Sequence, residues 1–141
     1  MKHTLIALFA LAAVSAFADD ATVQKQKDVM KDMRWLAVSV EARATDTNEY
    51  PDVTFDELVK LIQPVYIKTA PTVDPWGTPY FYVGNGDHYR FVSAGADGKF
   101  EEHSRVMGPT EKDGHPTDDP NADIIFQDGT FTHYPVAGRQ E

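Results

Sequence analysis

Residues 74–98, DPWGTPYFYVGNGDHYRFVSAGADG, decide the fold of this chain. A Pro- and Gly-rich turn leads into two short aromatic segments, residues 80–83 and 89–92. Aromatic and β-branched residues favour strands, and the Gly-Asn-Gly-Asp linker at residues 84–87 is typical of a tight hairpin turn. The stretch therefore predicts an antiparallel β-hairpin.

A second hairpin is predicted nearer the C-terminus. Residues 124–126 and 131–134 are apolar and aromatic, and Asp128-Gly129 between them favours a two-residue turn. Residues 99–120, between the two hairpins, are polar and contain several Pro and Gly, which predicts a long surface loop. We expect the sheet to lie within residues 79–134.

Two helices are predicted before the strands. In residues 21–45, apolar side chains recur at steps of three and four, which gives one apolar stripe. Residues 55–62 follow the capping box Thr54-Phe55-Asp56-Glu57 and end before Pro64. Because the helices precede the strands instead of alternating with them, the order favours an α+β fold, with the long N-terminal helix packed on a small antiparallel sheet.

The first 18 residues have the pattern of a secretory signal peptide. Lys2 precedes an apolar run of about 14 residues, shorter than the roughly 20 that a spanning helix needs. Ala16-Phe17-Ala18 then offers an A-x-A cleavage site before Asp19-Asp20. The alternative is an uncleaved membrane anchor. Cleavage would leave a single domain, residues 19–141, that is periplasmic or secreted and has no stable membrane anchor.

Composition excludes several classes of protein. A chain of 141 residues has room for one domain, and its 42% hydrophobic residues allow a real core. The 22 acidic against 13 basic residues give a net charge of −9, which argues against nucleic-acid binding. Without cysteine there are no disulfides, thiolate nucleophiles or Cys-type zinc sites. The five histidines lack the close spacing typical of zinc ligands, so we interpret them as surface residues.

The most informative polar residues are Asp97-Gly98 and the segment Asp118-Asp119-Pro120-Asn121-Ala122-Asp123. Oxygen-bearing side chains at alternate positions let a curved loop direct several oxygens at one centre, as calcium requires. An EF-hand is excluded because Ile124 stands where that loop needs Gly. The alternative is an acidic turn whose Asp and Asn side chains cap backbone amides.

An enzyme is not expected. The chain has no G-x-S-x-G motif and no Gly-rich phosphate loop before a helix. Glu101, Glu102 and His103 offer acid and base groups, but their predicted place in a flexible stretch is unsuited to catalysis, which needs rigid positioning. The aromatic strands and Trp76 could form a ligand-stacking face, although such residues more often belong to a core.

Four motifs in order resemble the type II secretion system protein G family, the major pseudopilin. Residues 48–51, NEYP, resemble the end of the family's helix, and residues 74–80 match its D-P-W-G-x-P-Y signature at every fixed position. Residues 93–98, SAGADG, are similar to its G-A-D-G segment, and residues 122–124 to its A-D-I. The resemblance implies a helix packed on a small antiparallel sheet and protein partners from a secretion system or a pilus-like assembly.

The resemblance also implies a bound calcium ion between the last two motifs. Carried over by motif, Asp97 would be a side-chain ligand and Ala94 would offer its carbonyl. Asp118 or Asp119 would be the second carboxylate, and Asp123 lies close enough in sequence to contribute. These are hard oxygen ligands, which calcium prefers.

The N-terminus departs from the family. The Gly of the prepilin cleavage site is absent, Ala7 stands where the family has Glu, and the apolar run is short. The chain thus resembles the soluble head without its stem. We expect an exported calcium-binding structural or interaction protein associated with type II secretion. The alternatives are a free extracytoplasmic binding module and a small acid/base enzyme.

Overall fold

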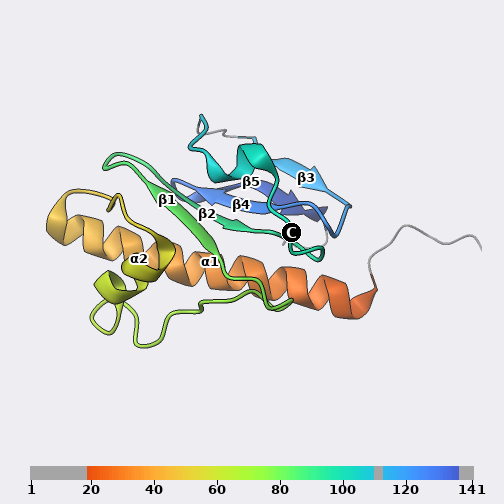
Figure 1. The fold of residues 1–141 in the computed structure, drawn as a ribbon, viewed down its shortest axis with the longest axis horizontal. Coiled ribbons are helices and arrows are strands. Elements are labelled where there is room, and N and C mark those ends of the chain that lie inside the picture. The colour runs from red at the N-terminus through yellow and green to blue at the C-terminus, as the bar shows by residue number, and fades with distance from the viewer. Residues whose placement is uncertain (1–18, 110–112, 137–141) are drawn as a thin grey trace, which may run out of the picture.

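The computed structural model describes residues 19–109 and 113–136 and shows an α+β fold (Figure 1). Five strands form one sheet in the order β1-β2-β4-β5-β3. The elements in chain order are α1 (Asp20–Thr47), α2 (Phe55–Ile62), β1 (Phe81–Gly84), β2 (Tyr89–Ser93), the 3-10 helix η1 (Glu102–Arg105), β3 (His115–Thr117), β4 (Ile124–Gln127) and β5 (Thr130–Pro135). The predicted class, a long N-terminal helix packed on a small sheet, is confirmed.

Both helices begin and end where their capping residues lie. Asp19 caps α1 by accepting a hydrogen bond from the Thr22 N–H at 2.7 Å, and Asn48 ends the helix in the left-handed region at φ 60°. In α2, the Thr54 hydroxyl accepts from the Glu57 N–H at 3.3 Å while the Glu57 carboxylate accepts from the Thr54 N–H at 3.0 Å. The predicted capping box is therefore confirmed.

The two predicted hairpins form the centre of the sheet. β1 and β2 pair antiparallel, as do β4 and β5, and β2 and β4 join the hairpins by a further antiparallel pairing. Asp128 and Gly129 turn between β4 and β5 with φ values of 50° and 93°. Positive φ at both positions is typical of a type I′ turn, which explains the Asp-Gly sequence.

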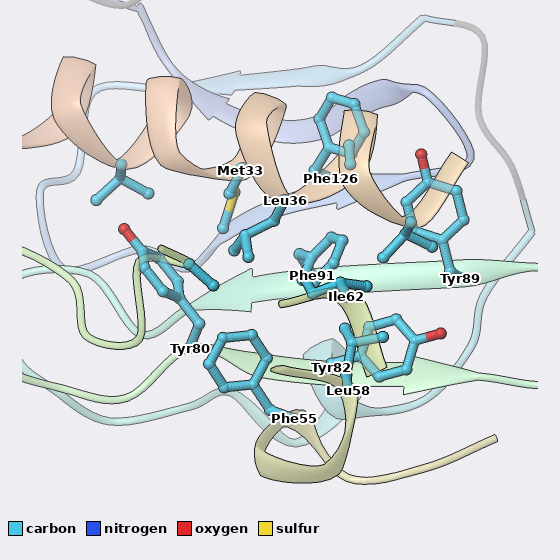
Figure 2. Close-up of a cluster of buried hydrophobic side chains, with 14 of the residues drawn as sticks. Met33, Leu36, Phe55, Leu58, Ile62, Tyr80, Tyr82, Tyr89, Phe91 and Phe126 are labelled. Atoms are coloured by element: carbon cyan, nitrogen blue, oxygen red, sulfur yellow. The ribbon is translucent and has the colours of Figure 1, made fainter. Parts of the chain in front are cut away.

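One hydrophobic core lies between the helices and one face of the sheet (Figure 2). The hydroxyl groups of two of its buried tyrosines reach carboxylates on α1: Tyr80 donates to Asp32 at 2.8 Å, and Tyr89 donates to Glu41 at 2.8 Å. Aromatic side chains of β1 and β2 therefore belong to the hydrophobic core, and Trp76 packs against the same cluster. The labelled core side chains are Met33, Leu36, Phe55, Leu58, Ile62, Tyr80, Tyr82, Tyr89, Phe91 and Phe126.

The opposite face of the sheet is covered by the segment predicted as a surface loop. This segment contains η1 and β3, so it is more ordered than the surface loop that the sequence predicts. β3 pairs parallel with β5, and the other pairings of the sheet are antiparallel, as predicted. Side chains alternate along a strand, so Arg90, between the core residues Tyr89 and Phe91, faces away from α1. Figure 1 shows η1, in teal, across the sheet from α1.

Arg90 is buried and holds this covering segment in place. It donates from Nε to Gln127 Oε1 at 2.6 Å and from a terminal nitrogen to the Ser104 carbonyl at 3.3 Å. Gln127 in turn donates to the Gly108 carbonyl at 2.7 Å. Buried polar groups need such partners, which is the physical reason that polar residues of the loop lie on the sheet instead of in solvent.

Candidate functional site

The two acidic segments singled out in the sequence lie against each other. Ser93 of β2 and Ile124 of β4 are register partners, so the loop that leaves β2 meets the segment that enters β4. The Ala96 N–H donates to the Pro120 carbonyl at 2.9 Å. Gly95, at φ 73°, approaches so closely that a Cβ there would lie 2.7 Å from the Ala122 carbonyl oxygen. Backbone carbonyls are therefore gathered beside the two acidic segments.

Asp123 is the most unusual residue of this region because its carboxyl group is buried, with the residue only 2% exposed. Oδ2 accepts a hydrogen bond from the Glu101 N–H at 2.8 Å. Asp123 Oδ1 and the neighbouring Ser104 Oγ have no well-formed hydrogen bond among the described residues. A buried oxygen with unused lone pairs is costly, so this atom is suited to receive a cation or a proton.

The charge state of Asp123 reflects its surroundings. Burial raises the pKa of its carboxyl group, and the nearby charges of Glu101 and Asp97 raise it further. The Ser104 hydroxyl and the Glu101 N–H act in the opposite direction. A cation beside the group would favour its ionised form, because an opposite charge offsets the repulsion between carboxylates.

The other expected ligands are placed differently. Asp97 is exposed, and its Oδ1 accepts from the Lys99 N–H at 2.9 Å. Ala94 is fully buried, and because its side chain is a methyl group, only its carbonyl oxygen could bind a cation. Asp119 Oδ1 accepts from the Asn121 N–H at 2.9 Å, the backbone-capping role that the acidic-turn alternative predicts, and Asp118 is exposed.

The structure thus brings Asp97 and Asp123 near each other. Within residues 19–109 and 113–136, no three His, Cys, Asp or Glu side chains form a group that could hold a metal ion. A cation at the acidic loop would therefore take at most a pair of carboxylates and would depend on backbone carbonyls for the rest. Calcium accepts such a mixture of carboxylate and carbonyl oxygens.

The turn at residues 74–80 supports the acidic loop. This link between the turn and the loop was not predicted from the sequence. Asp74 is buried, and its Oδ1 accepts from the N–H groups of Trp76 and Thr78, each at 3.0 Å. Its Oδ2 accepts from the Ser93 hydroxyl at 3.0 Å, and Ser93 Oγ accepts from the Gly95 N–H at 3.3 Å. The signature turn and the acidic loop are thus one hydrogen-bonded unit. The signal available in the sequence was an Asp that opens a Pro-Gly turn.

The acid/base residues considered for an enzyme lie on the surface. Glu102 and His103 are in η1, so this stretch is not the irregular segment expected from the sequence. Glu101 lies 3.5 Å from His103, measured from Oε2 to Nε2, with the two side chains 47% and 63% exposed. Solvent screens such a pair, and its interaction is weak.

Comparisons with known proteins identify the family. Residues 15–106 match the family model described as type II secretion system protein G, and this range is well over half of the chain. The match includes both helices, the signature turn, Ala94 and Asp97, whereas Asp118, Asp119 and Asp123 lie beyond it. Comparisons with curated proteins and with solved structures give no match. In the part of the chain that the structure describes, no helix has both the length and the apolar character needed to cross a membrane. The chain belongs to the type II secretion system protein G family.

Proposed function

We propose that this protein is an exported, calcium-binding structural component of type II secretion that acts through contacts with other proteins. Family membership supports a pseudopilin-like role in secretion, and the family is one of structural pseudopilins instead of enzymes. The signal-peptide pattern of residues 1–18, which lies outside the described residues, supports a place outside the cytoplasm, in the periplasm or beyond it.

The buried Oδ1 of Asp123, which has no well-formed hydrogen bond among the described residues, is the observation that carries the calcium proposal. Asp97 lies near enough for its charge to raise the pKa of Asp123, so two carboxylates would share one ion. The carbonyls of Asn121 and Ala122, which face Gly95, and the carbonyl of Ala94 are available as further hard ligands. Bound calcium would supply positive charge that ties the two ends of the acidic loop together.

Calorimetric titration of the purified protein with calcium tests this site. We expect one ion per chain and a large loss of affinity in Asp123→Asn and in Asp97→Asn, because each change removes a negative ligand. Asp119→Asn should have a smaller effect, since Asp119 already accepts a backbone hydrogen bond in its own turn. Asp87→Asn, on the distant β1–β2 turn, is the matched control and should bind as the parent protein does.

The secretion role has a separate test. In the source organism, deletion of the gene should lower type II secretion, and the parent sequence should restore it. Site-specific crosslinking from exposed positions on α1 should then capture components of the secretion machinery. Unchanged secretion after deletion would favour the alternative, a free extracytoplasmic binding module. Mass spectrometry of the exported protein should find Asp19 at its N-terminus, whereas a retained apolar segment would indicate an anchored subunit.

A further inference from the structure

One side of α1 carries large apolar side chains that the rest of the described chain leaves exposed. The helix buries its other side in the core, whereas Trp35 and Val38 are 58% and 63% exposed. Lys31 and Arg34 lie within about two turns of them on the same side and are exposed as well. Trp and Arg are enriched in protein interfaces relative to the rest of a protein surface. We call these four residues the outer face of α1.

A groove lies along each side of the outer face. On one side, Arg34 and Val38 line a groove of about 510 Å³ together with Phe131 and other residues of the β4–β5 hairpin. On the other side, Lys31 and Trp35 line a groove of about 520 Å³ together with residues 67–71. Helices pack by fitting the side-chain ridges of one into the grooves of the other. A ridge with a groove on each side therefore favours a helix as the partner.

The outer face is basic although the chain is acidic. Residues 25–38 contain four basic and two acidic side chains, against 13 basic and 22 acidic in the whole chain. The Arg34 guanidinium lies 5.0 Å from the centre of the Phe131 ring, which holds a cation at the edge of the first groove. Lys68 is exposed and lines the second groove opposite Lys31. Both grooves thus have cations at their rims.

The carboxylates closest to these grooves are engaged with tyrosine hydroxyl groups. Asp32 accepts a hydrogen bond from Tyr80 of the core at 2.8 Å. Glu41 accepts from Tyr89 at 2.8 Å and from Tyr50 at 3.0 Å. Their negative charge is therefore directed toward the protein, whereas the cations face solvent. The remaining carboxylate lies 3.7 Å from Lys31, in a pair that solvent screens because both side chains are more than a third exposed.

We propose that the outer face of α1 binds an amphipathic helix of another protein, one that carries Asp or Glu beside its apolar stripe. The apolar side chains of that helix would enter the two grooves and cover Trp35 and Val38, a recognition mode common for amphipathic helices. Its carboxylates would lie at the rim beside Lys31, Arg34 and Lys68, where opposite charge speeds association and selects the partner. The inference rests on the proposed role in protein contacts and names the chemistry of one such contact.

Two fluorescently labelled model peptides test this chemistry on the purified protein. Both are amphipathic helices with a leucine stripe, of about 18 residues, which is above the length at which isolated helices are marginal. One peptide has Glu and the other has Lys on both sides of the stripe. We expect the Glu peptide to bind with an affinity that falls as salt is added, and the Lys peptide to bind at least about tenfold more weakly, because like charges at an interface are costly. In NMR spectra, the Glu peptide should shift the signals of residues 31–38 and 67–71.

Variants locate the binding surface. Trp35→Ala, and Lys31→Glu combined with Arg34→Glu, should each weaken binding of the Glu peptide at least about tenfold, since an interface Trp is often a dominant contact and reversed charges repel. Val38→Ser should weaken it as well. Val106→Ser is the matched control: Val106 is equally exposed at 63% but follows η1, across the sheet from α1, and its loss should have no effect. The proposal is overturned if the Glu peptide does not bind, if both peptides bind equally, or if the two serine variants behave alike.

Crosslinking in the source organism identifies the natural partner. A photoreactive residue in place of Trp35 should crosslink to a segment of another protein that has helical apolar spacing and acidic residues. Crosslinks that reach only other copies of this chain, or a basic segment, would overturn the proposal. The tests of the proposed function stay separate, because Trp35→Ala should bind calcium as the parent does. Peptide binding with unchanged secretion after gene deletion would keep this surface and remove the secretion role, and the opposite pair of results would do the reverse.

Discussion

Asp74→Ala is predicted to be strongly destabilising. The buried carboxylate accepts hydrogen bonds from the Trp76 N–H, the Thr78 N–H and the Ser93 hydroxyl, each at 3.0 Å. A hydrogen bond to a charged group contributes about 1.5–3 kcal/mol, and alanine would leave all three donors without this partner. Because water entering the space would satisfy some of them, we expect a net loss of about 3–5 kcal/mol in the free energy of unfolding.

Urea unfolding followed by tryptophan fluorescence measures this loss. Asp74→Asn keeps an oxygen for the two N–H groups and changes only the contact to Ser93, so it should lose about 1–2 kcal/mol. Asp87→Ala removes an exposed carboxylate of the β1–β2 turn and should change stability by less than about 0.5 kcal/mol. A loss of less than about 1 kcal/mol in the free energy of unfolding of Asp74→Ala, with an unchanged slope of the urea dependence, would refute this prediction. Three buried hydrogen bonds to a carboxylate should contribute more than that.

Three further predictions concern the covering segment, the acidic loop and the buried tyrosines. Arg90→Met should cost about 2–4 kcal/mol and accelerate amide hydrogen exchange in residues 102–108, and unchanged exchange would show that Arg90 does not anchor them. Gly95→Ala should cost about 1–3 kcal/mol in urea unfolding, because φ is 73° and the added Cβ would lie 2.7 Å from a carbonyl oxygen; a neutral effect would contradict the close approach. Burial, together with Asp32 and Glu41, raises the pKa values of Tyr80 and Tyr89 above the ordinary 10.0, so the stability that their neutral forms provide is complete below pH 10 and declines as the pH rises beyond it. Unfolding free energies measured on both sides of pH 10 check this sign, and a rise above pH 10 would contradict it.

Local sequence signals predicted the elements well because each has a local physical cause. The capping box at Thr54 and Glu57 satisfies the first N–H groups of α2 regardless of the rest of the chain. The positive φ of Asp128 and Gly129 is a property of those two residues. The apolar stripe of α1 follows from helical periodicity, and the buried residues Val29, Met33, Leu36 and Val40 confirm it.

The covering segment could not be predicted because its contacts are nonlocal. Nothing near Arg90 in the sequence shows that its guanidinium will bind the Ser104 carbonyl, fourteen residues away along the chain. β3 is three residues long and contains Pro116, so neither its length nor its composition indicated a strand. The pairing of His115 with His133 depends on that strand, so it could not be predicted either.

The candidate cation site was predictable in part. The motif order placed Asp97 and Asp123 in segments that the structure brings together through the pairing of β2 with β4. The sequence did not distinguish the buried Asp123 from Asp119, which accepts a backbone hydrogen bond within its own turn. That distinction depends on burial by η1 and the Glu101 N–H, again a nonlocal effect. Calcium binding itself stays a prediction.

We propose that the acidic loop holds calcium through Asp123 and Asp97. A crystal structure of the protein grown with calcium, with anomalous diffraction data, tests it most directly. We expect an anomalous peak at about 2.3–2.6 Å from Asp123 Oδ1 and an Asp97 carboxylate oxygen, with backbone carbonyls completing the coordination. An anomalous map without a peak at the loop would contradict this expectation. So would an ion bound by Asp118 and Asp119 with Asp123 Oδ1 outside its coordination sphere.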